Sequence, residues 1–129
     1  MLEKNSGLLG ISGVTLDTRI LRKRKDAASR MALDMFSYRV RQTVGAYLAV
    51  LGTAEAIVFG GGIGENTPEV RSMVCEGLAG WGVCLDDQLN QTTRNGDARI
   101  STAASKLAVW AIHADEAMQL AYECAQVSI

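Results

Sequence analysis

The sequence predicts an α/β layered domain with a short mixed sheet flanked by helices. Helical and strand-like patterns alternate along the chain, which is typical of a sheet covered by helices. Two short segments are continuous apolar runs, as expected for strands that are buried on both faces. The chain has 129 residues, of which 48% are hydrophobic, so it has enough apolar side chains for one modest domain with a core.

The segment before the first strand contains a loop and a long helix. Residues 5–19 are small, apolar and interrupted by glycine, which predicts an ordered loop with short extended pieces. Residues 26–51 carry apolar side chains at spacings of three and four, which predicts the longest helix, and Gly52 is expected to end it. The apolar run Ala54–Phe59 then predicts a short buried strand.

A second helix is expected after a glycine-rich turn. It begins at Thr67, with Pro68 at the first helical position, or at Asn66, with Glu69 completing a capping box. Both starts remain open from the sequence. The apolar side chains expected on this helix are Val70, Met73, Val74, Leu78 and Trp81.

The rest of the chain predicts two strands and a final helix. Val83–Leu85 suits a short strand, and the polar stretch 86–97 is expected to open with a turn and to contain another at Asn95-Gly96. Lys106–Ile112 is the second continuous apolar run and predicts a buried strand, and residues 115–126 predict a helix. Three strands are few for a self-sufficient sheet, so we expect the chain to be part of a larger protein.

Composition excludes several classes of function. The formal net charge of −1 does not favour nucleic acid or an anionic membrane as the main partner, and no apolar run is long enough to span a bilayer. The N-terminus lacks the order of a signal peptide. Cys75, Cys84 and Cys124 form no Cys-x-x-Cys pair and predict buried thiols in the reducing cytoplasm. His113 is the single histidine, which rules out a multi-histidine metal site.

The most informative segment is Ala56–Asn66, in which an apolar strand leads into Gly60-Gly61-Gly62-Ile63-Gly64. Glycine lets a backbone approach a ligand closely, and the helix start behind it offers free N–H groups and partial positive charge, which suits a nucleotide. The segment matches neither a dinucleotide-binding fingerprint nor a Walker loop. The alternative is a tight strand-to-helix turn, but four glycines in five residues are more than such a turn requires.

Four segments form a set that is more specific than any single motif: Ser6–Gly13, Asp17-x-Arg19, Val58–Asn66 and Glu69–Arg71. In this order, over nearly the whole chain, they resemble the C-terminal part of the acetate kinase family, which includes propionate kinases. The resemblance implies an actin-like ATPase (ribonuclease H-like) fold. Residues 1–129 would be the C-terminal part of its second, nucleotide-binding lobe, with the N-terminal lobe absent.

The resemblance also implies an activity. The family transfers the γ-phosphoryl group of ATP to a short-chain carboxylate, acetate or propionate, giving ADP and an acyl phosphate. It implies a magnesium ion and a homodimer. Because the family's catalytic residues lie upstream, we expect this chain to supply the adenosine site, to contain no catalytic residue and to be inactive alone. The alternative is a non-enzymatic module for nucleotide binding or dimerisation.

Individual residues acquire roles from the same resemblance. The adenosine-contacting positions that it implies are Asp17, Arg19, Gly62, Ile63, Gly64 and Asn66. Asp17 would accept hydrogen bonds from the ribose or the amino group, and Arg19 would stack on the base or meet phosphate. Without the resemblance, a surface salt bridge between Asp17 and Arg19 is the simpler interpretation.

Glu116 matches the family glutamate that contacts magnesium directly or through water. The alternative is that an acidic residue in the first turn complements the helix dipole. The sequence departs from the family at Thr18, where an aromatic residue or methionine is common, and at His113, which replaces a proline. For His113 we expect a packed or hydrogen-bonded histidine near the sheet edge, and for the basic run 22–25 a solvated surface.

Overall fold

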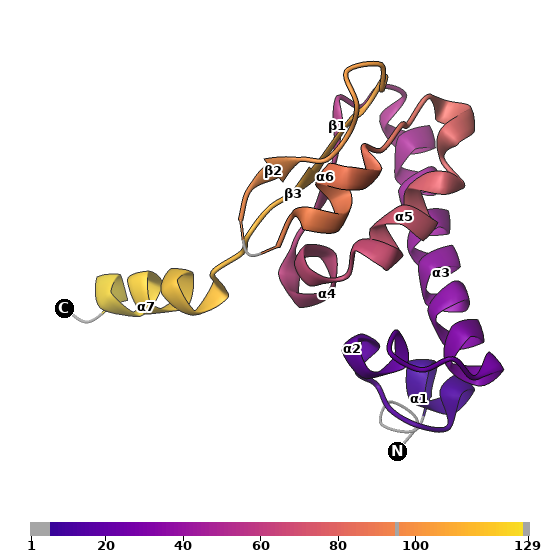
Figure 1. Ribbon diagram of the computed structural model, residues 1–129. Coiled ribbons are helices and arrows are strands. Elements are labelled where there is room, and N and C mark those ends of the chain that lie inside the picture. Colours follow the sequence, from indigo (N-terminus) through magenta and orange to yellow (C-terminus); the bar gives the residue numbers. More distant parts are fainter. Residues whose placement is uncertain (1–5, 95, 128–129) are drawn as a thin grey trace.

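A three-stranded mixed sheet packs through one face against helices in the computed structural model, which describes residues 6–94 and 96–127 (Figure 1). The elements in chain order are α1 (Gly7–Ser12), α2 (Thr18–Leu21), α3 (Ala27–Leu51), β1 (Ala56–Phe59), α4 (Gly61–Asn66), α5 (Pro68–Glu76), the 3₁₀ helix η1 (Ala79–Trp81), α6 (Asp87–Thr92), β2 (Ala98–Arg99), β3 (Ala108–Ala111) and α7 (Glu116–Val127).

The sheet has the order β1-β3-β2 and confirms the predicted mixed α/β class. β1 runs parallel to β3, with Val58 opposite Trp110, and β2 runs antiparallel to β3 on its other side. Side chains alternate along β1, where Ile57 and Phe59 are buried and Val58 is 57% exposed. The expectation that the strands are covered on both faces is therefore wrong for β1, whereas the outward side chains of β3 are half-buried.

The main core lies between the inner face of this sheet and helices α3 and α5. Its buried side chains are Leu48, Ile57, Phe59, Val70, Val74, Cys75, Leu78, Val83, Ile100, Leu107, Val109 and Ala111. Burial raises the pKa of the Cys75 thiol to about 12, so this cysteine stays protonated and apolar in character. Cys84 and Cys124 are exposed instead, contrary to the expectation that all three thiols are buried.

Helix α3 begins and ends where the sequence predicts. Asp26 caps α3 by accepting a hydrogen bond from the Ser29 N–H (2.9 Å), and Gly52 ends the helix with a φ of +69°. Helix α5 begins after Thr67 with Pro68 at its first turn, which decides between the two starts that the sequence left open. Among the helices of the described residues, none combines the length and apolar character that a bilayer span requires.

Several short elements differ from the prediction. The segment 5–19 was expected as a loop with extended pieces, and its described residues, 6–19, contain α1 and the start of α2. The predicted strand 83–85 is reduced to a single bridge between Leu85 and Ser101, and the third strand is β2. Asp86 caps α6 rather than opening a turn, because its carboxylate accepts the Leu89 N–H (2.9 Å).

Two further predictions have a different outcome. Trp81 was expected on the apolar face of the second helix but lies in η1 and is 52% exposed, because α5 already ends at Glu76. The expected turn at Asn95-Gly96 falls partly on Asn95, which lies outside the described residues.

Arg71 of α5 holds three helices together through a fully buried guanidinium. Nη1 donates to the main-chain oxygens of Gly64 (2.7 Å) and Glu65 (2.6 Å), near the C-terminal end of α4. Nη2 donates to the main-chain oxygens of Asn90 (2.6 Å) and Thr93 (3.2 Å), at the end of α6. Helix C-termini carry partial negative charge, so two helix ends stabilise this buried cation.

We therefore predict that Arg71→Ala lowers the free energy of unfolding by about 3 kcal/mol, because it leaves buried carbonyl oxygens without a donor. Urea denaturation followed by circular dichroism measures the change. The control is Arg39→Ala on α3, an exposed arginine that donates to Gln42, which should change stability by less than about 0.5 kcal/mol. Equal stability of the two variants would show that the buried guanidinium does not hold these helices.

Candidate nucleotide-binding site

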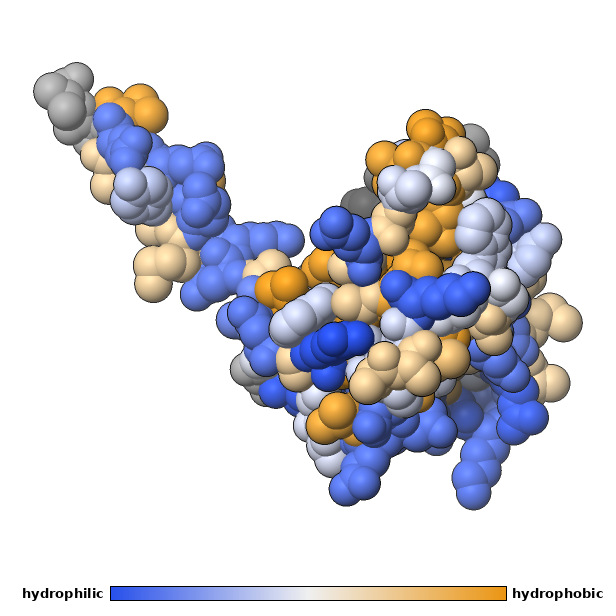
Figure 2. Space-filling model, turned by 90° about the horizontal axis from the view of Figure 1, so that it is seen from above, coloured by the Kyte–Doolittle hydropathy of each residue, from blue (hydrophilic) through white to orange (hydrophobic). Residues whose placement is uncertain are grey.

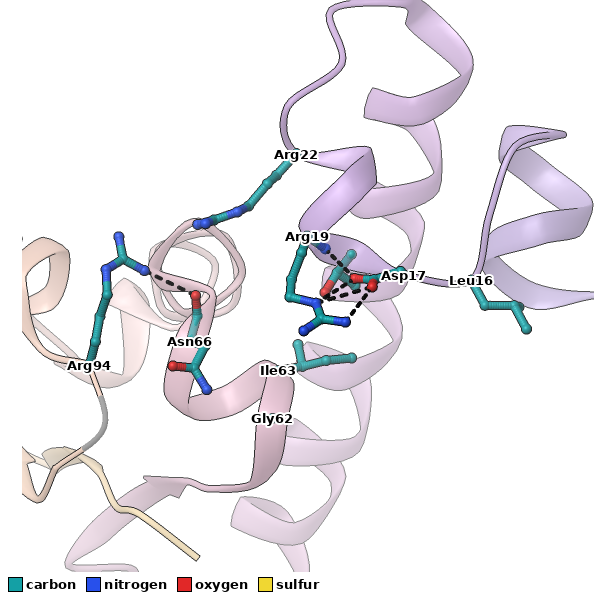
Figure 3. Close-up of a pocket in the computed structure, with 9 residues that line it drawn as sticks. Leu16, Asp17, Arg19, Arg22, Gly62, Ile63, Asn66 and Arg94 are labelled. Carbon is teal, nitrogen blue, oxygen red and sulfur yellow. Dashed lines mark hydrogen bonds and ion pairs between the residues drawn. The ribbon is translucent and has the colours of Figure 1, made fainter.

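A cavity of roughly 750 Å³ lies between the start of α2 and helix α4 (Figure 3). The residues that line it are Leu16, Asp17, Thr18, Arg19, Arg22, Gly62, Ile63, Asn66 and Arg94. Five of the six positions expected to contact adenosine are thus brought together from two segments of the chain. Gly64 is the exception, since it does not line the cavity.

Asp17 forms one wall of the cavity because it caps α2. Its carboxylate accepts the Arg19 N–H (2.8 Å) and forms an ion pair with the Arg19 guanidinium (2.6 Å). The hydrogen bonds from the Arg19 side chain and main chain lower the pKa of Asp17 to about 2, so the carboxylate is ionised at neutral pH. The salt bridge that the sequence offers as the simpler interpretation is present, and it lies at the cavity (Figure 3).

The glycine-rich segment folds as a helix and not as the expected turn. Gly61 has a φ of +69°, a conformation that favours glycine, and it begins the short helix α4, which ends before Thr67. Ile63 and Asn66 of this helix both line the cavity (Figure 3). This additional helix was not anticipated, because a six-residue helix with three glycines has a weak local pattern.

Gly62 and Gly64 differ in what surrounds them. A Cβ at Gly64 would lie 3.1 Å from the main-chain carbon of Phe59, so glycine is needed there for α4 to pack on β1. A Cβ at Gly62 would meet no atom within 4 Å. The fold therefore does not require glycine at position 62, whereas a ligand that approaches the cavity wall closely would.

Two further arginines line the cavity and were not predicted as site residues from the sequence. Arg22, assigned to the solvated basic run, is partly buried and pairs with Glu69 (3.3 Å). Arg94 donates to the main-chain oxygen of Asn66 (3.1 Å). The only feature of the sequence that draws attention to Arg22 is its place at the start of a basic run. No motif or pattern around Arg94 indicates that it lines a cavity. Three arginines and one carboxylate line the cavity, which favours a ligand with negative charge.

Glu65 also belongs to α4, but it contacts His113 and Ala114 instead of lining the cavity. Its side chain is 5% exposed, Oε1 accepts the Ala114 N–H (3.0 Å), and Oε2 lies 2.7 Å from His113 Nδ1. The bond from Ala114, with the bond to His113, lowers the pKa of Glu65, and the bond to Glu65 raises the pKa of His113. His113 is therefore hydrogen-bonded near the sheet edge, as the sequence predicts.

Glu116, the predicted magnesium contact, is the first residue of α7 and does not line the cavity. Within residues 6–94 and 96–127, no three His, Cys, Asp or Glu side chains form a group that could hold a metal ion. Magnesium on nucleotides takes few protein carboxylates and keeps several waters. The donors described here do not form a magnesium site by themselves, and the role of Glu116 stays a prediction.

Comparison with known proteins adds an independent finding. The model of the acetokinase family matches residues 1–122. The acetate kinase of Solibacter usitatus is 42% identical over 125 residues, which cover 94% of this chain and 30% of that protein. The acetate kinase of Chloroherpeton thalassium is 42% identical over 132 residues, covering 96% of this chain and 32% of that protein.

Solved structures give the same result for the fold. The acetate kinase of Porphyromonas gingivalis superposes with a TM-score of 0.85 at 33% identity, covering 95% of this chain and 32% of that one. A propionate kinase from Francisella tularensis has a TM-score of 0.84 at 34% identity, covering 95% and 32%. The arrangement is thus the actin-like ATPase fold of these kinases, and the chain spans about a third of the length of the curated relatives it matches.

The two glycines give a prediction about stability. Gly62→Ala leaves the free energy of unfolding unchanged or raises it by at most about 1 kcal/mol, because alanine favours helix and the space is open. Gly64→Ala lowers it by roughly 1–3 kcal/mol, because the methyl group crowds Phe59. Thermal denaturation measures both. Gly45→Ala in α3, where the added Cβ also meets nothing within 4 Å, is the control for helix propensity. Equal effects of the first two changes would contradict this distinction.

The Glu65–His113 pair gives a prediction about pH. The raised pKa of His113 means that its contribution is fully present below its usual pKa of 6.5 and is lost as pH rises through the raised value. The lowered pKa of Glu65 means that its contribution is present above 4.5 and is lost as pH falls through the lowered value. The Tm difference between wild type and His113→Ala should therefore be largest between pH 4.5 and 6.5.

Melting curves of the two proteins across this range and at alkaline pH measure the difference. No other histidine complicates the comparison, because His113 is the single one in the chain. A Tm difference that is the same in acid and in alkali would mean that the ion pair does not contribute.

Proposed function

The chain belongs to the acetokinase family, and we propose that it supplies the adenosine-binding part of a kinase that transfers the γ-phosphoryl group of ATP to acetate or propionate. One observation supports the nucleotide role above others. Asp17 and Arg19 converge with Gly62, Ile63 and Asn66 on one cavity, although the two segments are far apart in the chain.

The cavity offers the groups that a nucleoside requires. The Asn66 amide can donate and accept hydrogen bonds at a base edge, and the apolar Ile63 side chain can pack on the base or sugar. The ionised Asp17 carboxylate can accept from ribose hydroxyls or an amino group. The Arg19 guanidinium is paired with Asp17 but its side chain is 72% exposed, so its flat face can stack on a ring. The open space at Gly62 lets the ligand reach the backbone, and Arg22 and Arg94 offset its negative charge.

The remaining parts of the reaction are proposed to come from outside these 129 residues. Acyl phosphate formation requires a bound carboxylate and positive groups around the migrating phosphoryl, in addition to a metal ion and a nucleotide. We propose that residues 1–129 correspond to the C-terminal part of the second lobe and that Glu116 contacts magnesium there when the nucleotide is bound. The chain alone would then bind ATP or ADP without turning it over.

A role in self-association is the second candidate. Large apolar side chains are exposed on α3 and α7, among them Met35, Tyr47 and Leu120. Exposed apolar surface of this kind favours a protein contact. We propose that these helices contribute to the contact between two copies of the kinase.

Isothermal titration calorimetry tests the nucleotide role. We predict that the chain binds ADP and that Asp17→Ala and Gly62→Val each weaken binding at least about tenfold, or 1.4 kcal/mol, the first by removing a charged acceptor and the second by filling the cavity. Gly45→Val, a helical glycine outside the cavity, is the control and should bind as wild type does. Absence of binding, or equal binding by all variants, would contradict the proposal.

A coupled assay of acyl phosphate formation tests whether the catalytic groups lie outside these 129 residues. The 129-residue chain with ATP, magnesium and acetate should form no acyl phosphate above background. A full-length acetate kinase is the positive control. A rate near that of the full-length enzyme would show that the catalytic groups lie within this chain.

A further inference from the structure

Glu65 is a buried carboxylate that the nucleotide site does not use. It belongs to α4, the helix that carries Gly62, Ile63 and Asn66 into the cavity, but it does not line the cavity itself. Its two oxygens contact the Ala114 N–H (3.0 Å) and His113 Nδ1 (2.7 Å), so the carboxylate connects α4 to the end of β3.

The residues that Glu65 contacts form the junction between β3 and α7. Every residue of α7 from Glu116 to Val127 is exposed, and the helix stands clear of the body in two views (Figures 1 and 2). The main-chain N–H of His113 donates to Asp97 (2.8 Å), which secures the junction on its other side. The helix itself is capped by Asp115, whose carboxylate accepts the Met118 N–H (2.9 Å). Because α7 is not buried against the body, the contacts of the junction determine where this helix start lies relative to the body.

Glu65 is held rigidly at its own backbone. Its main-chain oxygen accepts from Arg71 (2.6 Å), which is fully buried. Besides the two junction contacts, the Gly61 N–H also lowers the pKa of Glu65, but a buried carboxylate without these contacts would be only partly satisfied. The contact to the junction is therefore kept in the folded state. A ligand in the cavity would contact Gly62, Ile63 and Asn66 of α4. The same helix is hydrogen-bonded to the junction through Glu65.

We propose that Glu65 is a positioning residue that sets the start of α7, and with it Glu116, relative to the nucleotide cavity. The inference rests on the proposed nucleotide function of that cavity. A nucleotide bound against Gly62, Ile63 and Asn66 restrains α4, and Glu65 passes the restraint to Ala114. Because coupling between two sites is reciprocal, loosening the junction also weakens nucleotide binding.

Amide hydrogen exchange with and without saturating ADP tests this coupling. In wild type, ADP slows exchange of the junction amides around Ala114 by at least about threefold, in addition to those of α4. Glu65→Leu keeps a similar side-chain volume but removes the carboxylate. By calorimetry it binds ADP more weakly than wild type does, and at saturating ADP exchange at the junction is no longer slowed. Glu76→Leu, at the exposed end of α5, is the matched control and behaves as wild type does.

A second variant covers the case in which Glu65→Leu does not fold. His113→Ala removes one of the two contacts from an exposed side chain, and it should retain only part of the ADP-dependent protection. A merely structural role of Glu65 would lower stability without changing the effect of ADP on the junction.

The outcomes separate the two proposals. ADP binding without protection of the junction in wild type, or equal protection in Glu65→Leu, overturns the positioning role and leaves the nucleotide site intact. Absence of ADP binding by wild type overturns the nucleotide function and this inference with it.

Discussion

The buried guanidinium of Arg71 is the interaction on which the geometry of the cavity depends. It joins the C-terminal ends of α4 and α6 through hydrogen bonds to their main-chain oxygens, and Asn90 Oδ1 accepts from its Nε (2.7 Å). Desolvation lowers the pKa of this guanidinium from its usual value, and the surrounding carbonyl dipoles offset the cost of burial. Because α4 presents Ile63 to the cavity and Glu65 to the β3–α7 junction, both depend on this one cation.

The parts of the fold that are readable from the sequence are those with strong local signals. Helix α3 spans seven turns of apolar periodicity between Asp26 and Gly52, so propensity, pattern and caps agree. Helices α1, α2, α4 and α6 have four to six residues, too few for a periodic pattern, and are stabilised mainly by tertiary packing. Trp81 was misplaced because apolar side chains continue at helical spacing beyond Gly77, the residue that caps α5.

The residues of the candidate site were predicted mainly from the resemblance to a family, and less from the chemistry of the residues themselves. Asp17 and Arg19 form an ordinary surface ion pair in sequence terms, and only the fold brings them to Gly62 and Asn66. Arg94 could not be found in this way, because it reaches Asn66 from a distant polar segment. The glycines also needed the structure: Gly64 serves packing against Phe59, whereas Gly62 leaves space for a ligand.

We propose that the cavity between α2 and α4 receives a nucleoside phosphate. The most direct measurement is an ADP titration of the chain followed through its backbone amide resonances by nuclear magnetic resonance. Binding of ADP in this cavity should give the largest shifts at Asp17, Arg19, Gly62, Ile63 and Asn66. Shifts confined to another surface, or a spectrum unchanged at millimolar ADP, would contradict it.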